Sequence, residues 1–173
     1  MIRLPIGPKY ATLEIERRWL VNSSAMELLR AAPSRHIEDR YLVQTRLRLR
    51  KVLETGKAPV FKLGKKYGEA DGETDENTDE KTGELSRYVV STYLTEAEFD
   101  TLSALPAYVA RKVRYAVEGG ALDVYETPSA GLTIFEVEFS SEAKAREYVP
   151  PSFVSQEVTG VSGYTGYALA KGL

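Results

Sequence analysis

The chain has 173 residues, with 23 Lys and Arg, 25 Asp and Glu, one His and no cysteine, which gives a formal net charge of −2. This length suits a single domain with its own core, and the lack of cysteine excludes a disulfide framework or a thiolate metal site. The opening residues lack the apolar run of a signal peptide or a membrane span. We therefore expect a soluble, cytoplasmic protein whose residues 1–173 form one domain.

Acidic residues are concentrated in one segment. Residues 69–84 hold eight acids and one lysine, whereas the rest of the chain has 22 Lys and Arg against 17 Asp and Glu and is net positive. The segment has no apolar periodicity and is rich in Gly, Thr, Asp and Asn, so we predict a flexible, solvated loop from about 66 to 84. The positive remainder of the protein could attract an anion.

The first predicted element is a strand over 11–21, in which charged and apolar residues alternate. Glu14, Glu16 and Arg18 share one face of this strand, and Ile15 and Trp19 lie on the other. Alternation with a period of two is typical of a strand with two different faces. Two acids and a base on one face are the first sign of a charged site.

The later elements follow the same pattern of alternating strands and short helices. We predict helices where a capping residue precedes a short amphipathic run and a proline follows it. In chain order we expect a helix with a serine cap over 23–33, strands over 45–51 and 60–64, a helix over 95–106 with a Thr95–Glu98 capping box, strands over 110–117, 122–126 and 131–139, and a helix over 140–151. The predicted fold class is mainly β.

The charged strand faces are segregated by sign. Carboxylates occupy Glu14, Glu16, Glu136 and Glu138, and cations occupy Arg46, Arg48, Arg50, Lys62, Lys112 and Arg114. A single charged face usually lies against water, but segregation by sign favours a closed antiparallel barrel with its charged faces inward and its apolar faces covered by helices. Buried cations need an anionic ligand and buried carboxylates need a cation. A polyphosphate with a divalent metal supplies both.

The chain resembles CYTH-domain proteins, the triphosphate tunnel metalloenzymes, over almost its whole length. The Glu-x-Glu-x-Lys signature of that family is matched by Glu14, Glu16 and Arg18. Further matches follow in family order: Tyr41, the Arg-x-Arg strand of 46–50, Lys62 with Lys65 as a further candidate, Lys112 and Arg114, Asp123, Glu136 and Glu138, and the closing Glu-Val-Thr of 157–159 with its helix. The resemblance implies an eight-stranded antiparallel β-barrel or tunnel, flanked by short helices, that binds a triphosphate with Mg²⁺ or Mn²⁺.

The resemblance also implies roles for the matched residues, and the chemistry of the side chains agrees. Carboxylate oxygens suit Mg²⁺ or Mn²⁺, and guanidinium groups suit phosphate oxygens. The predicted metal ligands are Glu14, Glu16, Asp123, Glu136 and Glu138, and the predicted substrate-binding residues are Arg18, Arg46, Arg48, Arg50, Lys62, Arg87 and Arg114. We expect Tyr41 and Lys112 to carry a proton if the fold brings them together.

Three positions depart from the family pattern. Arg18 stands where the signature has lysine, Val89 and Ser91 stand where many members have a further glutamate pair, and Val161 and Ser162 follow the closing motif where an acid is usual. A smaller number of acids leaves open whether one metal or two would bind.

The expected function is metal-dependent hydrolysis of inorganic tripolyphosphate or a small organic triphosphate. Two alternatives stay open: a cyclase that converts ATP to cyclic AMP, and a non-catalytic module that binds polyphosphate or a nucleotide. The expected partner is a triphosphate-containing small molecule and neither a nucleic acid nor a membrane, with a homodimer left open.

Overall fold

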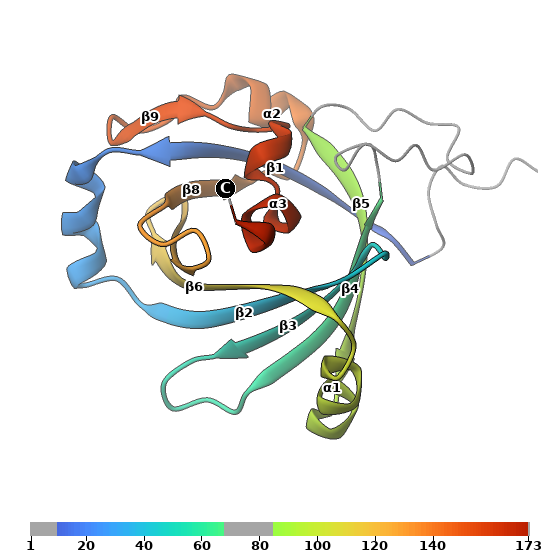
Figure 1. Ribbon diagram of the computed structural model, residues 1–173. Coiled ribbons are helices and arrows are strands. Elements are labelled where there is room, and N and C mark those ends of the chain that lie inside the picture. The colour runs from blue at the N-terminus through green and yellow to red at the C-terminus, as the bar shows by residue number, and fades with distance from the viewer. Residues whose placement is uncertain (1–9, 68–84, 173) are drawn as a thin grey trace, which may run out of the picture.

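The computed structural model describes residues 10–67 and 85–172 (Figure 1). The strands of this part of the chain are β1 (Thr12–Val21), β2 (Ser34–Leu42), β3 (Leu47–Leu53), β4 (Val60–Tyr67), β5 (Ser86–Leu94), β6 (Ala107–Val117), β7 (Gly120–Thr127), β8 (Thr133–Glu138) and β9 (Val154–Glu157). Its helices are η1 (Ser23–Arg30), α1 (Glu96–Ser103), α2 (Glu142–Glu147), η2 (Ser162–Tyr164) and α3 (Gly166–Lys171).

The strands form one antiparallel sheet that closes into a barrel. The order is β5-β4-β3-β2-β6-β7-β8-β1-β9, and β5 also pairs with β1. This last pairing joins the first eight strands of the order into a ring, and β9 is an extra strand beside β1 (Figure 1). The predicted eight-stranded antiparallel barrel with short helices is confirmed.

The apolar strand faces point outward and are covered, as the alternation predicts. Trp19 of β1 packs on Phe135 of β8, with ring centroids 5.9 Å apart, and Ala25 of η1 completes this cluster. On another side of the barrel, Phe99 of α1 packs on Phe61 of β4 at 4.9 Å. These outer clusters bury the apolar halves of the strands and leave the charged halves facing the barrel interior.

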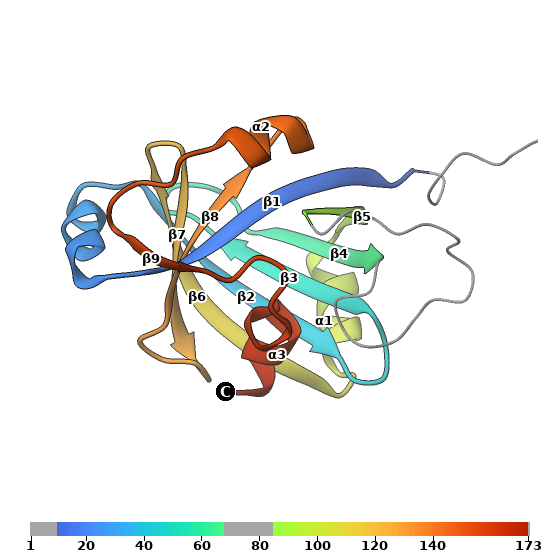
Figure 2. The same cartoon turned by 90° about the horizontal axis from the view of Figure 1, so that it is seen from above.

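Helix α3 packs against inward-facing side chains at one end of the barrel. Leu169 and Ala170 contact Ala110, Tyr125 and Ile134 of three neighbouring strands. Figures 1 and 2 show α3 within the ring of strands and beside β6, at the lower end of the barrel in the second view. One end of the interior is therefore apolar and filled, and the charged residues lie beyond it.

Several predicted boundaries differ from the structure by a few residues, and two of these differences concern the type or the extent of an element. The helix expected over 23–33 is the 3-10 helix η1, and its cap is Asn22, whose side chain accepts from the Ser24 amide at 3.1 Å. Strand β4 continues through Lys66 to Tyr67, because these residues extend its pairing with β5, so they do not belong to the acidic loop. The rest of that predicted loop lies outside the described residues.

The Thr95–Glu98 capping box is confirmed at the start of α1. Within residues 10–67 and 85–172, no helix combines the length and the apolar character needed to cross a bilayer.

Candidate functional site

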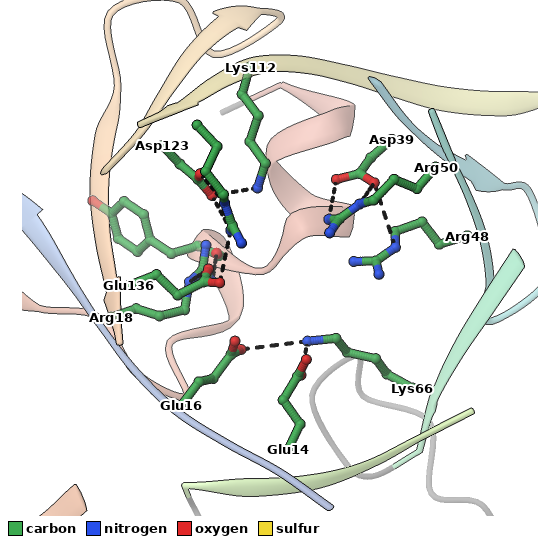
Figure 3. A network of polar contacts seen from close by, with 12 residues as sticks. Glu14, Glu16, Arg18, Asp39, Arg48, Arg50, Lys66, Lys112, Asp123 and Glu136 are labelled. Atoms are coloured by element: carbon green, nitrogen blue, oxygen red, sulfur yellow. Dashed lines mark hydrogen bonds and ion pairs between the residues drawn. The ribbon is translucent and has the colours of Figure 1, made fainter. Parts of the chain in front are cut away.

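The inner faces of the barrel strands line a cavity of about 150 Å³. In the part of the chain that the structure describes, nine cations and four carboxylates line it: Arg18, Arg46, Arg48, Arg50, Lys65, Lys66, Arg87, Lys112, Arg114, Glu14, Glu16, Glu136 and Glu138. This excess of positive charge in a partly enclosed space attracts anions. Figure 3 shows how many of these side chains converge.

Strand β3 supplies the first pair of cations, and strand β2 supplies the acid that holds them. Arg50 donates from Nε and Nη2 to the two oxygens of Asp39 at 2.6 and 2.8 Å, and Arg48 Nε lies 3.6 Å from Asp39 Oδ1. Burial alone would raise the pKa of Asp39, but the two guanidinium groups outweigh it and hold the pKa well below its usual range. Asp39 is therefore an ionised, buried anchor.

Strand β6 supplies the second pair of cations, and Asp123 of strand β7 holds them. Lys112 Nζ donates to Asp123 Oδ2 at 2.6 Å, and Arg114 donates to both oxygens of Asp123 at 2.6 and 2.7 Å. Asp123 is fully buried, and the cations beside it lower its pKa against the effect of burial. Both carboxylate oxygens are thus engaged by the neighbouring strand.

Arg114 also connects the second pair to the glutamates of β8. Its Nη2 donates to Glu136 Oε1 at 2.8 Å, and Arg18 Nε of β1 lies 3.5 Å from Glu136 Oε2. Burial opposes ionisation of Glu136, yet the attraction of Arg114 and Arg18 lowers its pKa to about 2. Arg18 is held in place by donating from Nη1 to the Tyr164 carbonyl at 2.6 Å.

The acids at the start of β1 have a different partner. Lys66, near the end of β4, forms an ion pair with Glu14 and lies 3.6 Å from Glu16 Oε1 (Figure 3). Burial and the nearby charge of Glu136 raise the pKa of Glu16. Glu16 is also directly opposite Glu138 in the β1–β8 register. Like charges that face each other across a sheet are unfavourable unless a cation lies near them.

These carboxylates have the chemistry of a site for a hard divalent cation. Mg²⁺ and Mn²⁺ prefer carboxylate oxygens, and Glu14, Glu16, Glu136 and Glu138 all line the same cavity. Within the described residues, however, no three acid or histidine side chains are grouped as a ready metal cluster. The side chains of Glu14 and Glu16 are directed at Lys66 instead. The donor set fits such an ion, and binding requires the ammonium of Lys66 to give up these two carboxylates.

Most predicted site residues line the cavity, and two do not. Tyr41 and the predicted arginines and glutamates named above all contribute to the wall, but Lys62 and Asp123 are outside the lining. Lys62 Nζ lies 4.9 Å from the ring centroid of Tyr93, and Asp123 lies behind Lys112 and Arg114. Neither residue is part of the cavity wall, and their predicted roles stay predictions.

Tyr41 and Lys112, which we expect to carry a proton if they lie close together, both line the cavity. Burial, together with the negative charge of Asp39, raises the pKa of Tyr41 to about 12. Helix α3 packs closely here, since a β-carbon added at Gly166 would lie 1.9 Å from the Tyr41 hydroxyl. The absence of a side chain at residue 166 leaves room for that hydroxyl.

Two residues of the network were missed by the sequence prediction. Asp39 lies two positions before Tyr41 and so on the same strand face, and Lys66 lies two positions after Gly64 on the face that begins at Lys62. Extending the alternation of each strand by two residues would have found both.

No protein-family model and no curated protein sequence matches this chain. Its structure is similar to the crystal structure of the inorganic triphosphatase NE1496, with a TM-score of 0.54 and 22% identity, covering 92% of this chain and 95% of that one. A crystal structure solved as the hypothetical protein NE1496 gives a TM-score of 0.55 and 21% identity, covering 92% and 99%. The similarity confirms the predicted resemblance at the level of the fold: this chain folds as the inorganic triphosphatase NE1496 does.

Proposed function

We propose that this barrel binds a triphosphate together with Mg²⁺ or Mn²⁺ and hydrolyses one of its phosphoanhydride bonds. The observation that carries the proposal is the arrangement of charge in the cavity: cations fixed by buried aspartates face the glutamates of β1 and β8. The fold shared with an inorganic triphosphatase supports the same conclusion.

The fixed cations are proposed to hold the phosphate chain. Arg48, Arg50 and Arg114 line the cavity and are already oriented by Asp39 or Asp123, so little side-chain freedom is lost when an anion binds. Lys112 adds a point charge from the same wall. Arg18, Arg46 and Arg87 are proposed as further phosphate contacts because they line the same space.

Glu14, Glu16 and Glu138 are proposed as the main ligands of the divalent ion. They line the cavity and their carboxylates have no arginine partner among the contacts described, whereas the oxygens of Glu136 and Asp123 are engaged by arginines or lysine. When bound, the ion neutralises negative charge on the phosphate oxygens, which lowers the barrier to phosphoryl transfer. Glu136 is proposed as a secondary ligand, and Asp123 as an anchor of Lys112 and Arg114 that does not bind the ion.

Tyr41 is proposed to donate a hydrogen bond to a phosphate oxygen and not to act as a base. With its pKa raised to about 12, the hydroxyl keeps its proton at neutral pH. In the reaction, the oxygen of a water molecule bonds to a terminal phosphorus while the bond from that phosphorus to the bridging oxygen breaks. The bridging oxygen leaves as part of pyrophosphate, the other product is phosphate, and the proton that the water loses passes to solvent. The protein's task is to position the chain and balance its charge.

The proposal is tested by measuring phosphate released from tripolyphosphate with Mg²⁺ and then with Mn²⁺. We expect release with at least one ion, and strong loss of release in Arg50→Gln, which removes a cavity cation. Arg111→Gln is the matched control, because Arg111 is a half-exposed residue of β6 that pairs with Glu38 outside the cavity lining. Tight binding without release under either ion would favour a binding module, and cyclic AMP with pyrophosphate from ATP would favour a cyclase.

A further inference from the structure

We propose that Lys66 is an internal counter-ion that holds Glu14 and Glu16 until a divalent cation takes its place. This inference rests on the proposed role of the two glutamates as metal ligands. It assigns Lys66 a part that the sequence motifs do not give it, since the motifs point to Lys62 and Lys65.

The ammonium of Lys66 lies between the carboxylates of Glu14 and Glu16. Its ammonium pairs with Glu14 and lies 3.6 Å from Glu16 Oε1, so one positive charge serves two carboxylates. Its neighbour on β5 is Val89, which offers no acidic alternative. The ammonium is thus held where a cation shared by Glu14 and Glu16 would lie.

The ion pair is accessible enough to exchange. The side chains of Lys66, Glu14 and Glu16 are 33%, 26% and 17% exposed, whereas Asp123 is fully buried with its two cations. A lysine ammonium has a flexible stem and no fixed bidentate geometry, so it leaves a carboxylate pair more readily than an arginine does. Lys66 is therefore the cation of this network that is best suited to be displaced.

Displacement gives the lysine a second use. Lys66 lines the same cavity as the cations proposed to hold the phosphate chain. Once an ion occupies Glu14 and Glu16, the freed ammonium can pair with phosphate oxygens. Metal and triphosphate then favour each other's binding through this side chain, and the coupling is reciprocal.

The test is a titration of the full chain with Mn²⁺ alone, following free ion by electron paramagnetic resonance. Lys66→Gln should bind Mn²⁺ at least about fivefold tighter than the unmodified protein, because both a competing ion pair and a nearby positive charge are removed. Lys51→Gln is the matched control: it removes the same charge from a lysine that lies over the Phe61 ring outside the cavity lining, and should change affinity by less than about twofold. Adding Glu16→Gln to Lys66→Gln should abolish the gain.

A second measurement guards against loss of folding. Circular dichroism checks that each variant is folded, and Lys66→Arg, which keeps a cation on the acids, should bind Mn²⁺ no tighter than the unmodified protein. If Mn²⁺ binds the unmodified protein and Lys66→Gln binds it equally or more weakly, the counter-ion role is overturned and the metal ligands stand. If none of the folded proteins binds Mn²⁺, the assignment of Glu14 and Glu16 fails, and this inference fails with it.

The coupling is measured by repeating the titration in the presence of a non-hydrolysable methylene-bridged triphosphate analogue. The analogue should tighten Mn²⁺ binding in both proteins, and by a smaller factor in Lys66→Gln. An equal factor in both would overturn the second use of Lys66.

Discussion

The two sides of the cavity hold their ion pairs in different ways. On β2–β3 and β6–β7, Asp39 and Asp123 are buried, and each binds the cations of a neighbouring strand with both oxygens. On the side of β1, Glu14 and Glu16 are partly exposed and share a single lysine from β4. The first arrangement is fixed, and the second is open to exchange.

We infer that Asp39 and Asp123 hold the cations of the network in place, whereas Glu14 and Glu16 are able to bind a ligand. A buried carboxylate with all its oxygens engaged cannot accept a new partner without leaving cations unpaired, which is costly in a dry interior. A partly exposed carboxylate loses little when its partner changes, because water and a new cation can replace it.

Removing a fixed acid should have the largest effect. Asp123→Asn keeps the shape of the side chain but leaves Lys112 buried without its counter-charge and Arg114 with Glu136 alone, so we expect the free energy of unfolding to fall by about 3–5 kcal/mol. Urea denaturation measures the loss. Glu14→Gln, on the exchangeable side, should cost less than about 1 kcal/mol. Equal losses in the two variants would remove the distinction between the two sides.

Removing an exchangeable acid should instead affect the proposed chemistry. Glu16→Gln removes a proposed metal ligand while keeping the fold, so we expect metal-dependent phosphate release to fall about a hundredfold. Glu54→Gln is the control, since Glu54 pairs only locally with Lys57 outside the cavity. Steady-state rates across a range of Mg²⁺ concentrations provide the measurement, and unchanged metal dependence would contradict the assignment.

Lowering the pH should reduce the free energy of unfolding over a defined range, because Glu136 must be protonated. The pKa of Glu136 is about 2 in the folded protein against an ordinary value of 4.5, so its stabilising effect is present above pH 4.5 and is lost as the pH falls towards 2. The lowered pKa values of Asp39 and Asp123 also make the folded protein less stable as the pH falls, whereas the raised pKa of Glu16 makes it more stable.

Urea denaturation at several pH values should therefore show a decline of about 3 kcal/mol from Glu136 across this range. Glu136→Gln should have a shallower decline, because one of the titrating groups has been removed. A decline of the same steepness in both proteins would show that Glu136 does not contribute it.

The smallest effect is expected at Lys62. Its ammonium lies over the exposed ring of Tyr93 and outside the cavity lining, so Lys62→Gln should leave phosphate release within about twofold of the unmodified protein. Rates at low salt, where a distant charge matters most, are the appropriate measurement. If Lys62→Gln reduced phosphate release as strongly as Arg50→Gln, Lys62 would be a substrate-binding residue.

The strands and the side they present to the interior could be predicted from the sequence because alternation is a local property. Glu14, Glu16 and Arg18 lie on the cavity wall as their spacing indicates, and so do Glu136 and Glu138. The pattern fixes which face a residue takes, but not its depth along the barrel. Lys62 therefore shares the inner face with Lys66 and still lies beyond the lining.

Pairing between strands could not be predicted in this way. Asp123 carries the residue type of a metal ligand, and only the register of β7 with β6 shows that it is opposite Arg114. Likewise, Lys66 of β4 forms an ion pair with Glu14 of β1, although these two strands do not pair with each other. Strand β5 lies between them in the barrel, and both side chains reach the same cavity. Such contacts depend on how the barrel closes, which no local pattern encodes.

The closure of the barrel through β1 also bears on how the protein folds. β1 is among the first elements of the chain, yet its partners β8 and β9 are among the last, and the bond from the Arg18 amide to Thr159 spans 141 positions. Contacts between segments so distant in sequence form late and slowly. Glu16 and Glu136 therefore come together only in the closing step, which also brings Trp19 of β1 onto Phe135 of β8. A divalent ion at these acids would bind the native chain alone, and so it would retard unfolding while leaving the rate of folding unchanged.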